Sequence, residues 1–199
     1  MPGFQEQRAI LDGWRGQGCR ERVAGNRAAL TFDDGPDPDA TPLVLEVLAD
    51  LGLKATFFMC GEQAERHPGL AARVAAKGHE VALHGHEHVR EPPAGDFERG
   101  LRAVEAASGR KPARFRPPYG RVVEAPLEVV LWSAWGLDWE PIGPERISEL
   151  VLRDLEPGAI VLLHDSARYA PRSSAEPTAL ALWAIAEGAA GRGIELGTL

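Results

Sequence analysis

The sequence contains little cysteine, with only Cys19 and Cys60 in 199 residues. This excludes a small fold held together by disulfides, because such scaffolds are dense in cysteine. Cys60 ends the apolar run ATFFMC, and a lone buried cysteine usually behaves as a small hydrophobic side chain. We therefore expect the two cysteines to remain unpaired.

Long apolar runs and basic clusters are also missing. No stretch approaches the roughly 18 consecutive apolar residues of a membrane-spanning helix. The formal net charge is -7 and no run of Lys or Arg occurs, so we expect no nucleic-acid partner. The N-terminal stretch lacks the apolar core of a secretory signal. As written, the chain is expected to be cytoplasmic, or secreted if a leader was removed.

Short apolar runs of the strand type alternate with segments of helical periodicity along the chain. Strands are predicted at residues 28–32, 55–59, 127–132, 159–163 and 194–199, with another inside GHEVALH. Helices are predicted at residues 41–50, 68–76, 97–107 and 177–188. Strands separated by helices imply crossover connections and a parallel sheet. The pattern therefore predicts a single domain of the α/β class.

Polar residues gather where the predicted strands end. Asp33 and Asp34 follow the first strand, the histidine-rich HGHEH follows the strand of GHEVALH, and His164 follows a wholly apolar strand. The carboxyl ends of parallel strands share one edge, where the sites of such folds are built. We expect a functional site at this edge.

The adjacent Asp33 and Asp34 point to opposite sides if the backbone is extended, so they cannot perform the same task. One carboxylate can bind while the other reacts. Asp-Gly-Pro is also ordinary turn chemistry, and turn capping is the alternative interpretation.

His84 and His88 are four positions apart, which places two imidazoles on one face of a helical turn within reach of one ion. Gly85, and not Glu, follows His84, so the metalloprotease motif HExxH is disfavoured. His86 should point away from an ion held by its neighbours. Structural or exposed roles are expected for two further histidines, His67 and His79.

Five motifs, TFDDGP, HGHEH, RFRPPYG, LDW and VLLHD, follow one another in this order. In order and nearly in spacing they resemble the motifs of the NodB-homology domain, the catalytic domain of polysaccharide deacetylases (carbohydrate esterase family four). The resemblance implies a distorted (β/α) barrel of about seven parallel strands over residues 26–199. Residues 1–25 would form an N-terminal helical extension.

The resemblance also implies a role for each matched residue. One divalent metal ion, most often zinc, would be bound by Asp34, His84 and His88. Asp33 would be the catalytic base, and Arg116 would lie beside it and hold it ionised.

The remaining matched residues would complete the site. Asp138 would pair with His164 and favour the protonated imidazole that an acid needs. Trp139 and Leu162 would form apolar walls around the acetyl methyl group, and the backbone N–H of Tyr119 would stabilise the oxyanion.

The implied activity is removal of N-acetyl groups from an N-acetylated oligo- or polysaccharide, chitin-like or peptidoglycan-like. Metal-bound water would attack the acetamide carbonyl, with Asp33 as base and His164 as acid. Two alternatives stay open: hydrolysis of a non-sugar amide or cyclic imide, and a non-catalytic carbohydrate-binding relative.

The sequence departs from the family pattern at three places. Gly85 stands where a Ser or Thr is usual, which removes a hydroxyl that helps fix the histidine loop. Trp135 stands where many members carry Asp. The interval between Tyr119 and Trp132 is too short for a complete helix, so a barrel helix should be missing or shortened there. That flank should be thinner, which would widen the groove, expose an edge or offer the surface of a homodimer.

Overall fold

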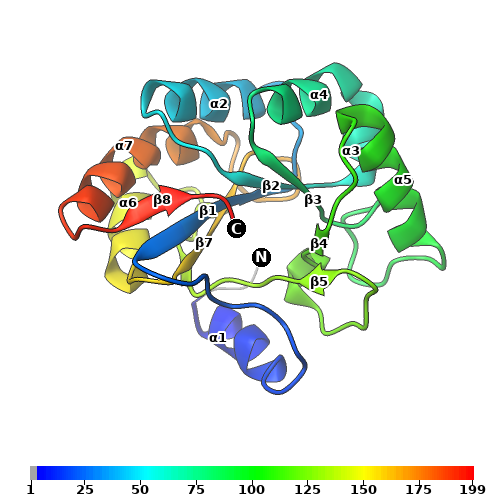
Figure 1. Cartoon of the computed structure of the whole chain (residues 1–199), viewed down its shortest axis with the longest axis horizontal. Coiled ribbons are helices and arrows are strands. Elements are labelled where there is room, and N and C mark those ends of the chain that lie inside the picture. Colours follow the sequence, from blue (N-terminus) through cyan, green and yellow to red (C-terminus); the bar gives the residue numbers. More distant parts are fainter. Residues whose placement is uncertain (1–3) are drawn as a thin grey trace.

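The computed structural model describes residues 4–199, which form one parallel sheet with helices packed on it (Figure 1). The strands are β1 (Arg27–Asp33), β2 (Thr56–Met59), β3 (Glu80–Leu83), β4 (Arg114–Phe115), β5 (Glu128–Val129), β6 (Ala134–Trp135), β7 (Ile160–His164) and β8 (Glu195–Gly197). Their order is β5-β4-β3-β2-β1-β7-β6, and β8 pairs with β1. Every one of these pairings is parallel. The sheet is a curled half-barrel, which confirms the predicted α/β barrel of about seven parallel strands.

The helices are α1 (Phe4–Gly13), α2 (Thr41–Asp50), α3 (Gly61–Arg66), α4 (Pro68–Ala76), α5 (Asp96–Ser108), α6 (Pro144–Asp154) and α7 (Glu176–Ala190). A short 3-10 turn covers Pro118–Gly120. Helices α2 to α7 lie along the outside of the sheet, whereas α1 lies apart from them at the bottom of the view (Figure 1). None of the helices in the described part of the chain is both long and apolar enough to cross a bilayer.

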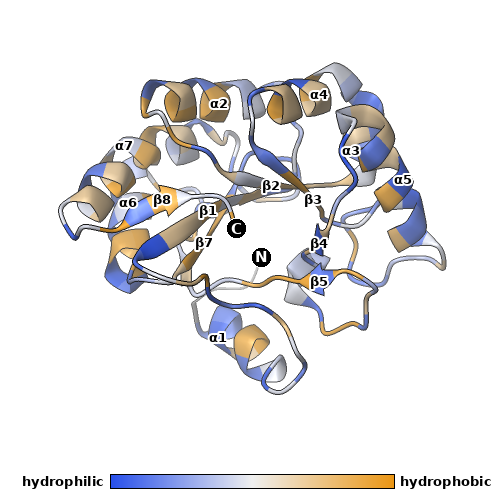
Figure 2. Cartoon of the chain, in the orientation of Figure 1, coloured by the Kyte–Doolittle hydropathy of each residue, from blue (hydrophilic) through white to orange (hydrophobic). Residues whose placement is uncertain are grey.

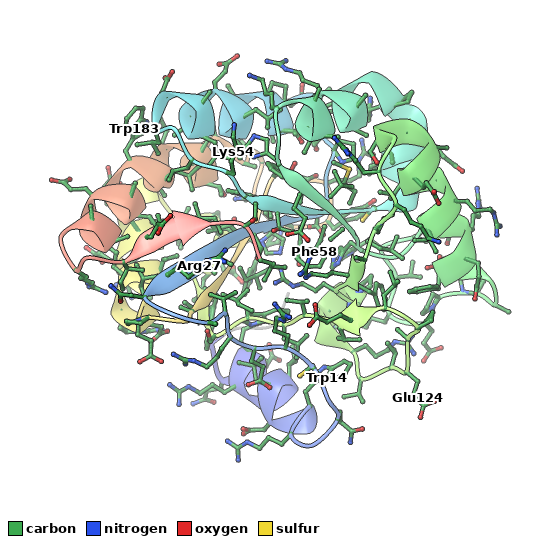
Figure 3. The ribbon with its side chains drawn as sticks, viewed as in Figure 1. Trp14, Arg27, Lys54, Phe58, Glu124 and Trp183 are labelled. Atoms are coloured by element: carbon green, nitrogen blue, oxygen red, sulfur yellow. The ribbon has the colours of Figure 1, made fainter. Side chains whose placement is uncertain are left out.

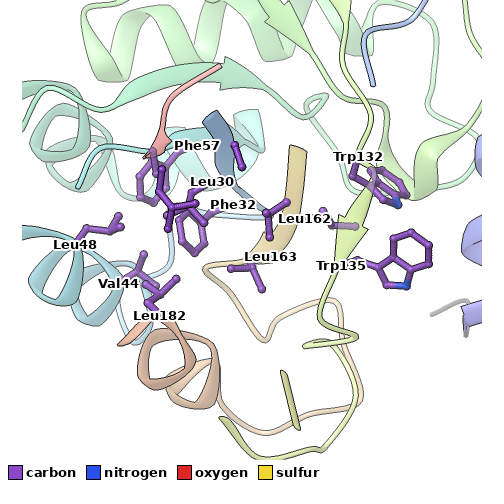
Figure 4. Packing of buried hydrophobic residues seen from close by; sticks show 14 of the residues in the cluster. Leu30, Phe32, Val44, Leu48, Phe57, Trp132, Trp135, Leu162, Leu163 and Leu182 are labelled. Carbon is purple, nitrogen blue, oxygen red and sulfur yellow. The ribbon is translucent and has the colours of Figure 1, made fainter. Parts of the chain in front are cut away.

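The central strands are almost continuously apolar because both of their faces are covered. Every residue of β7 is buried, and so are six of the seven residues of β1. Leu30 and Phe32 of β1 pack against Val44 of α2 and Leu182 of α7 (Figure 4). The hydrophobic colouring of Figure 2 is accordingly concentrated on the central strands and on parts of the helices.

The sequence predicted four of these helices to within two residues: α2, α4, α5 and α7. It missed α3 and α6, and it treated β4 as part of a loop. The predicted strand at residues 127–132 was too long, because regular pairing with β4 is confined to Glu128–Val129. Beyond it, Val130 forms an isolated bridge with Arg20, a residue of the N-terminal segment.

The interval between Tyr119 and Trp132 indeed contains no α-helix. The N-terminal segment packs at the start of this interval, whereas residues 121–128 are exposed or half-buried. Trp14, labelled in Figure 3, donates its indole N–H to the carbonyl of Gly120 at 2.8 Å. The expected exposure therefore remains over residues 121–128, and a wider groove or a homodimer surface there stays a prediction.

Both cysteines are free, as expected: Cys19 is partly buried and Cys60 is buried. The division into an extension of residues 1–25 and a domain of residues 26–199 stays a prediction. Residues 1–3 of that extension lie outside the described residues.

Candidate active site and metal centre

The residues singled out by the motifs meet at the carboxyl ends of the strands. Asp33 and His164 are register partners at the ends of β1 and β7, and His84 directly follows β3. A pocket of about 30 Å³ is lined by Gln7, Asp33, His84, His88, Pro117, Tyr119, Gly120, Trp132, Trp139, Leu162 and His164. Residues from all five motifs therefore share one pocket.

Asp34, His84 and His88 form a candidate metal centre. Their ligand atoms all lie within 4.8 Å of one another. Oδ1 of Asp34 lies 3.4 Å from Nε2 of His84 and 3.2 Å from Nε2 of His88. Asp34 has a φ of 81°, in the left-handed region that L-residues seldom adopt except where a site requires it.

The orientation of His84 is fixed by a hydrogen bond to the backbone. Its Nδ1 lies 2.7 Å from the carbonyl oxygen of Arg116. A carbonyl can only accept, so Nδ1 carries a proton and Nε2 is the ring nitrogen that faces Asp34. This is the tautomer that binds a metal ion through Nε2.

The charge states of Asp34 and His88 also suit a cation. Burial raises the pKa of Asp34, but the nearby imidazoles of His88 and His84 outweigh it and hold the pKa below its ordinary value. Burial lowers the pKa of His88 to about 4, although Asp34 opposes the shift. At neutral pH the trio therefore offers a carboxylate and a neutral imidazole.

A divalent ion fits this donor set. Both oxygens of Asp34 are buried and lack a well-directed hydrogen-bond donor among the described residues. An unsatisfied buried carboxylate is costly unless a cation or another charge compensates it. The same observation disfavours the turn-capping role for Asp34.

Asp96 of α5 supports the loop that carries the histidines. Its carboxylate accepts the backbone N–H of His86 at 2.9 Å and that of Glu87 at 3.0 Å. Gly85 has a φ of +79°, and a Cβ there would lie 3.2 Å from Oδ2 of Asp96. The loop is thus held without a hydroxyl at position 85.

The remaining histidines lie away from the centre, as expected. Nε2 of His86 points toward Glu65, 3.9 Å away. His79 is buried, and its Nδ1 accepts the backbone N–H of Ala55 at 3.2 Å. His67 lies between α3 and α4.

Asp33 is paired with Arg116. One guanidinium nitrogen of Arg116 lies 2.7 Å from Oδ1 of Asp33 and 2.8 Å from Oγ1 of Thr31. The other N–H groups of Arg116 donate to the carbonyls of Val130 and Leu131. Burial lowers the pKa of the completely buried Arg116, and Asp33 opposes that shift.

Asp138 and His164 form a second ionic pair. Nδ1 of His164 lies 2.8 Å from Oδ1 of Asp138. Burial alone would lower the pKa of His164, but Asp138 overcomes this and raises the pKa to about 9. The imidazole is therefore protonated at neutral pH and can donate a proton.

Several residues of this region were not predicted from the sequence. Arg172 and Thr178 both donate to Oδ2 of Asp138, Tyr169 stacks on His88 at 4.3 Å, and Trp132 and Gln7 line the pocket. These contacts join elements far apart in the chain, so no local spacing signals them. Trp139, which stands edge-on to His164, and Leu162 both line this pocket, and their role as walls around an acetyl methyl group stays a prediction.

The motifs and the fold agree with the comparison to known proteins. A family model described as polysaccharide deacetylase matches residues 20–131, more than half of the chain. The chain belongs to the polysaccharide deacetylase family.

Curated relatives and solved structures support this assignment. The chain is 42% identical to a chitooligosaccharide deacetylase of Bradyrhizobium sp. over 72% of this chain and 73% of that one. It is 34% identical to a peptidoglycan-N-acetylglucosamine deacetylase of Bacillus cereus over 69% of this chain, but spans only 55% of that relative. The crystal structure of the Bc1960 peptidoglycan N-acetylglucosamine deacetylase, in complex with 4-naphthalen-1-yl-N-oxidanyl-benzamide, is also similar. It is 27% identical, with a TM-score of 0.84 and 94% of each chain covered.

Proposed function

We propose that this chain is a metal-dependent hydrolase that removes the N-acetyl group from N-acetylated oligo- or polysaccharides. The observation that carries the proposal is the shared pocket in which Asp33 and His164 lie beside the trio Asp34, His84 and His88. A base and an acid on neighbouring strand ends, next to a cation site, are the groups that amide hydrolysis requires.

The relatives support N-acetylglucosamine as the sugar. One is named for peptidoglycan N-acetylglucosamine and another for chitooligosaccharide, and N-acetylglucosamine units are common to both substrates. We therefore propose a chitin-like or peptidoglycan-like chain as the substrate. The metal is proposed to be zinc, since two imidazoles and one carboxylate with open positions are a typical catalytic zinc set.

When bound by Asp34, His84 and His88, the ion would lower the pKa of a water molecule and polarise the acetamide carbonyl. Asp33 takes the proton of the attacking water. Arg116, 2.7 Å away, compensates the charge of Asp33 and fixes its orientation through a charge-assisted hydrogen bond.

His164 completes the proton transfers. An amine leaves poorly as an anion, so the departing nitrogen must receive a proton as the C–N bond breaks. His164, with a pKa of about 9, carries this proton at neutral pH, and Asp138 holds the ring through Nδ1. Nε2 is thereby left as the donor. We further propose that the backbone N–H of Tyr119 stabilises the oxyanion and that Trp139 and Leu162 enclose the acetyl methyl group.

The test is acetate release from N-acetylglucosamine oligomers and peptidoglycan fragments by chain stripped of metal and by chain to which zinc is returned. The proposal expects release only with zinc. His164→Ala is the matched control, because it should bind zinc and release little acetate. Acetate release that is unchanged by metal removal, or absent with bound zinc on every N-acetylated sugar, would contradict the proposal.

A further inference from the structure

Arg90 lies beside the candidate active site, although none of the five motifs includes it. Its guanidinium carbon lies over the ring of Tyr119, 4.4 Å from the ring centroid. Tyr119 lines the active-site pocket, and its ring centroid is 4.6 Å from that of His88. A single aromatic ring therefore connects this cation to a residue of the candidate metal centre.

The charge of Arg90 is exposed and has no acidic partner in the described part of the chain. Other arginines there do pair with carboxylates, as Arg22 does with Glu156 at 2.7 Å. The acidic residues that flank Arg90 in the sequence, Glu87 and Glu91, form no ion pair with it. The guanidinium is therefore available to an anion that arrives from solution.

The charge of Arg90 also acts on the pocket beside it. Burial raises the pKa of Tyr119, and the positive charge of Arg90 opposes this shift. The chain as a whole carries a net charge of -7, so its overall field repels anions. A cation next to the pocket makes this place more favourable for an anion than the acidic protein as a whole.

The contact with Tyr119 prepares Arg90 to bind a carboxylate. A guanidinium held over an aromatic ring has lost part of its freedom before a ligand arrives, which lowers the entropic cost of binding. Its N–H groups match the two oxygens of a carboxylate and form strong, charge-assisted hydrogen bonds with them.

The two kinds of substrate considered above differ in this chemical group. Chitin-like chains are uncharged, whereas peptidoglycan-like chains carry carboxylates next to their N-acetylglucosamine units. A carboxylate on the sugar beside the reacting acetamide would lie close to the edge of the pocket, where Arg90 is found.

We propose that Arg90 determines specificity by pairing with a carboxylate of the substrate, so that the chain acts on anionic N-acetylated glycans in preference to neutral ones. The inference rests on the proposed function, because it assumes that this pocket removes acetyl groups. Arg90 takes no part in the proton transfers and acts on the binding of the substrate.

The test uses one glycan in two forms on the zinc-loaded chain. The glycan alternates N-acetylglucosamine with a carboxylate-bearing sugar, and in the second form every carboxylate is converted to an amide. The wild type should release acetate from the anionic form with the higher kcat/KM. Arg90→Gln should lower kcat/KM for the anionic form about tenfold, mainly through KM, because it removes a charge-assisted contact that is present before the reaction. For the amidated form the change should stay below about twofold.

Two further variants complete the comparison. Arg90→Lys keeps the charge and should retain part of the preference for the anionic form. Arg73→Gln is the matched control, because Arg73 is also exposed but lies on α4, and it should leave both values of kcat/KM unchanged.

The outcomes separate this inference from the proposed function. If the wild type deacetylates both forms equally well, or if Arg90→Gln impairs both forms equally, Arg90 does not determine specificity although the hydrolase activity stands. If the zinc-loaded wild type releases no acetate from either form, the proposed function is overturned and the specificity falls with it. A loss confined to the anionic form, with partial rescue by lysine, supports the role of Arg90.

Discussion

Both carboxylate oxygens of Asp138 contact His164. Its Oδ1 lies 2.8 Å from Nδ1 of the ring, and its Oδ2 accepts the backbone N–H of the same residue at 2.9 Å. The second oxygen also accepts the hydroxyl of Thr178 at 2.8 Å and lies 3.4 Å from Arg172. Burial raises the pKa of Asp138, but His164 and Arg172 reverse the shift and lower it. The carboxylate is therefore a fixed negative charge under the imidazole.

The first prediction concerns the pH profile. The acid form of His164 is present below its pKa of about 9, so turnover should fall as the pH rises through about 9. A cation bound nearby would lower this pKa and move the fall in turnover to a lower pH. Asp138→Asn removes the charge that raises this pKa and should move the alkaline limb down by roughly 1–3 pH units. Turnover measured from pH 6 to 10 tests this prediction. If the alkaline fall in turnover stays at the same pH in Asp138→Asn, another group is the acid.

The same pair predicts a pH dependence of stability. The pKa of His164 in the folded chain lies above its ordinary value of 6.5, so its stabilising contribution is complete below pH 6.5. It should be lost as the pH rises through about 9. Urea unfolding at several pH values should reveal this loss in the wild type and a weaker dependence in Asp138→Asn.

A third prediction separates the role of Asp33 from that of the metal trio. Asp33→Asn should keep the metal and lose about 10²–10⁴-fold in turnover, the usual contribution of a positioned base. It should also destabilise the chain by about 3–5 kcal/mol, because Arg116 would be a buried charge without its partner. Adding Arg116→Met should restore part of the stability and none of the activity. Retained turnover in Asp33→Asn would remove this carboxylate as the base.

A fourth prediction assigns a positioning role to Tyr169. Its ring stacks on His88 at 4.3 Å, and its hydroxyl donates to Glu62 and accepts from Gln63. Tyr169→Leu should weaken zinc binding about tenfold, a typical effect of losing support for a ligand. Tyr169→Phe keeps the stacked ring and should weaken it less. Titration against a competing chelator measures the zinc affinity of each variant. Equal zinc affinities in the wild type, Tyr169→Leu and Tyr169→Phe would contradict this role.

The sequence predicted most of the site because its residues lie in short motifs at strand ends. Asp33 and His164 could be placed together from a parallel sheet alone, since the ends of such strands share one edge. The support of the histidine loop by Asp96 required the structure, because it depends on how α5 packs beside that loop.

Some features that were not predicted have a local signal in the sequence, and others have none. Helix α6 starts with Pro144 and carries Ile147, Leu150 and Val151 at helical spacing, so it could have been predicted. The position of Gln7 over the pocket could not, because it follows from the packing of α1 on Gly120. Such long-range packing leaves no periodic pattern in the sequence.

The central claim is that Asp34, His84 and His88 bind one divalent ion. The most direct test is the zinc content of the purified chain after saturation and removal of excess metal, with His84→Ala beside the wild type. His67→Ala serves as the control, because His67 lies between α3 and α4 and is not part of the trio. The account predicts one zinc ion in the wild type and in His67→Ala, and none in His84→Ala. Equal zinc content in all three chains would contradict it.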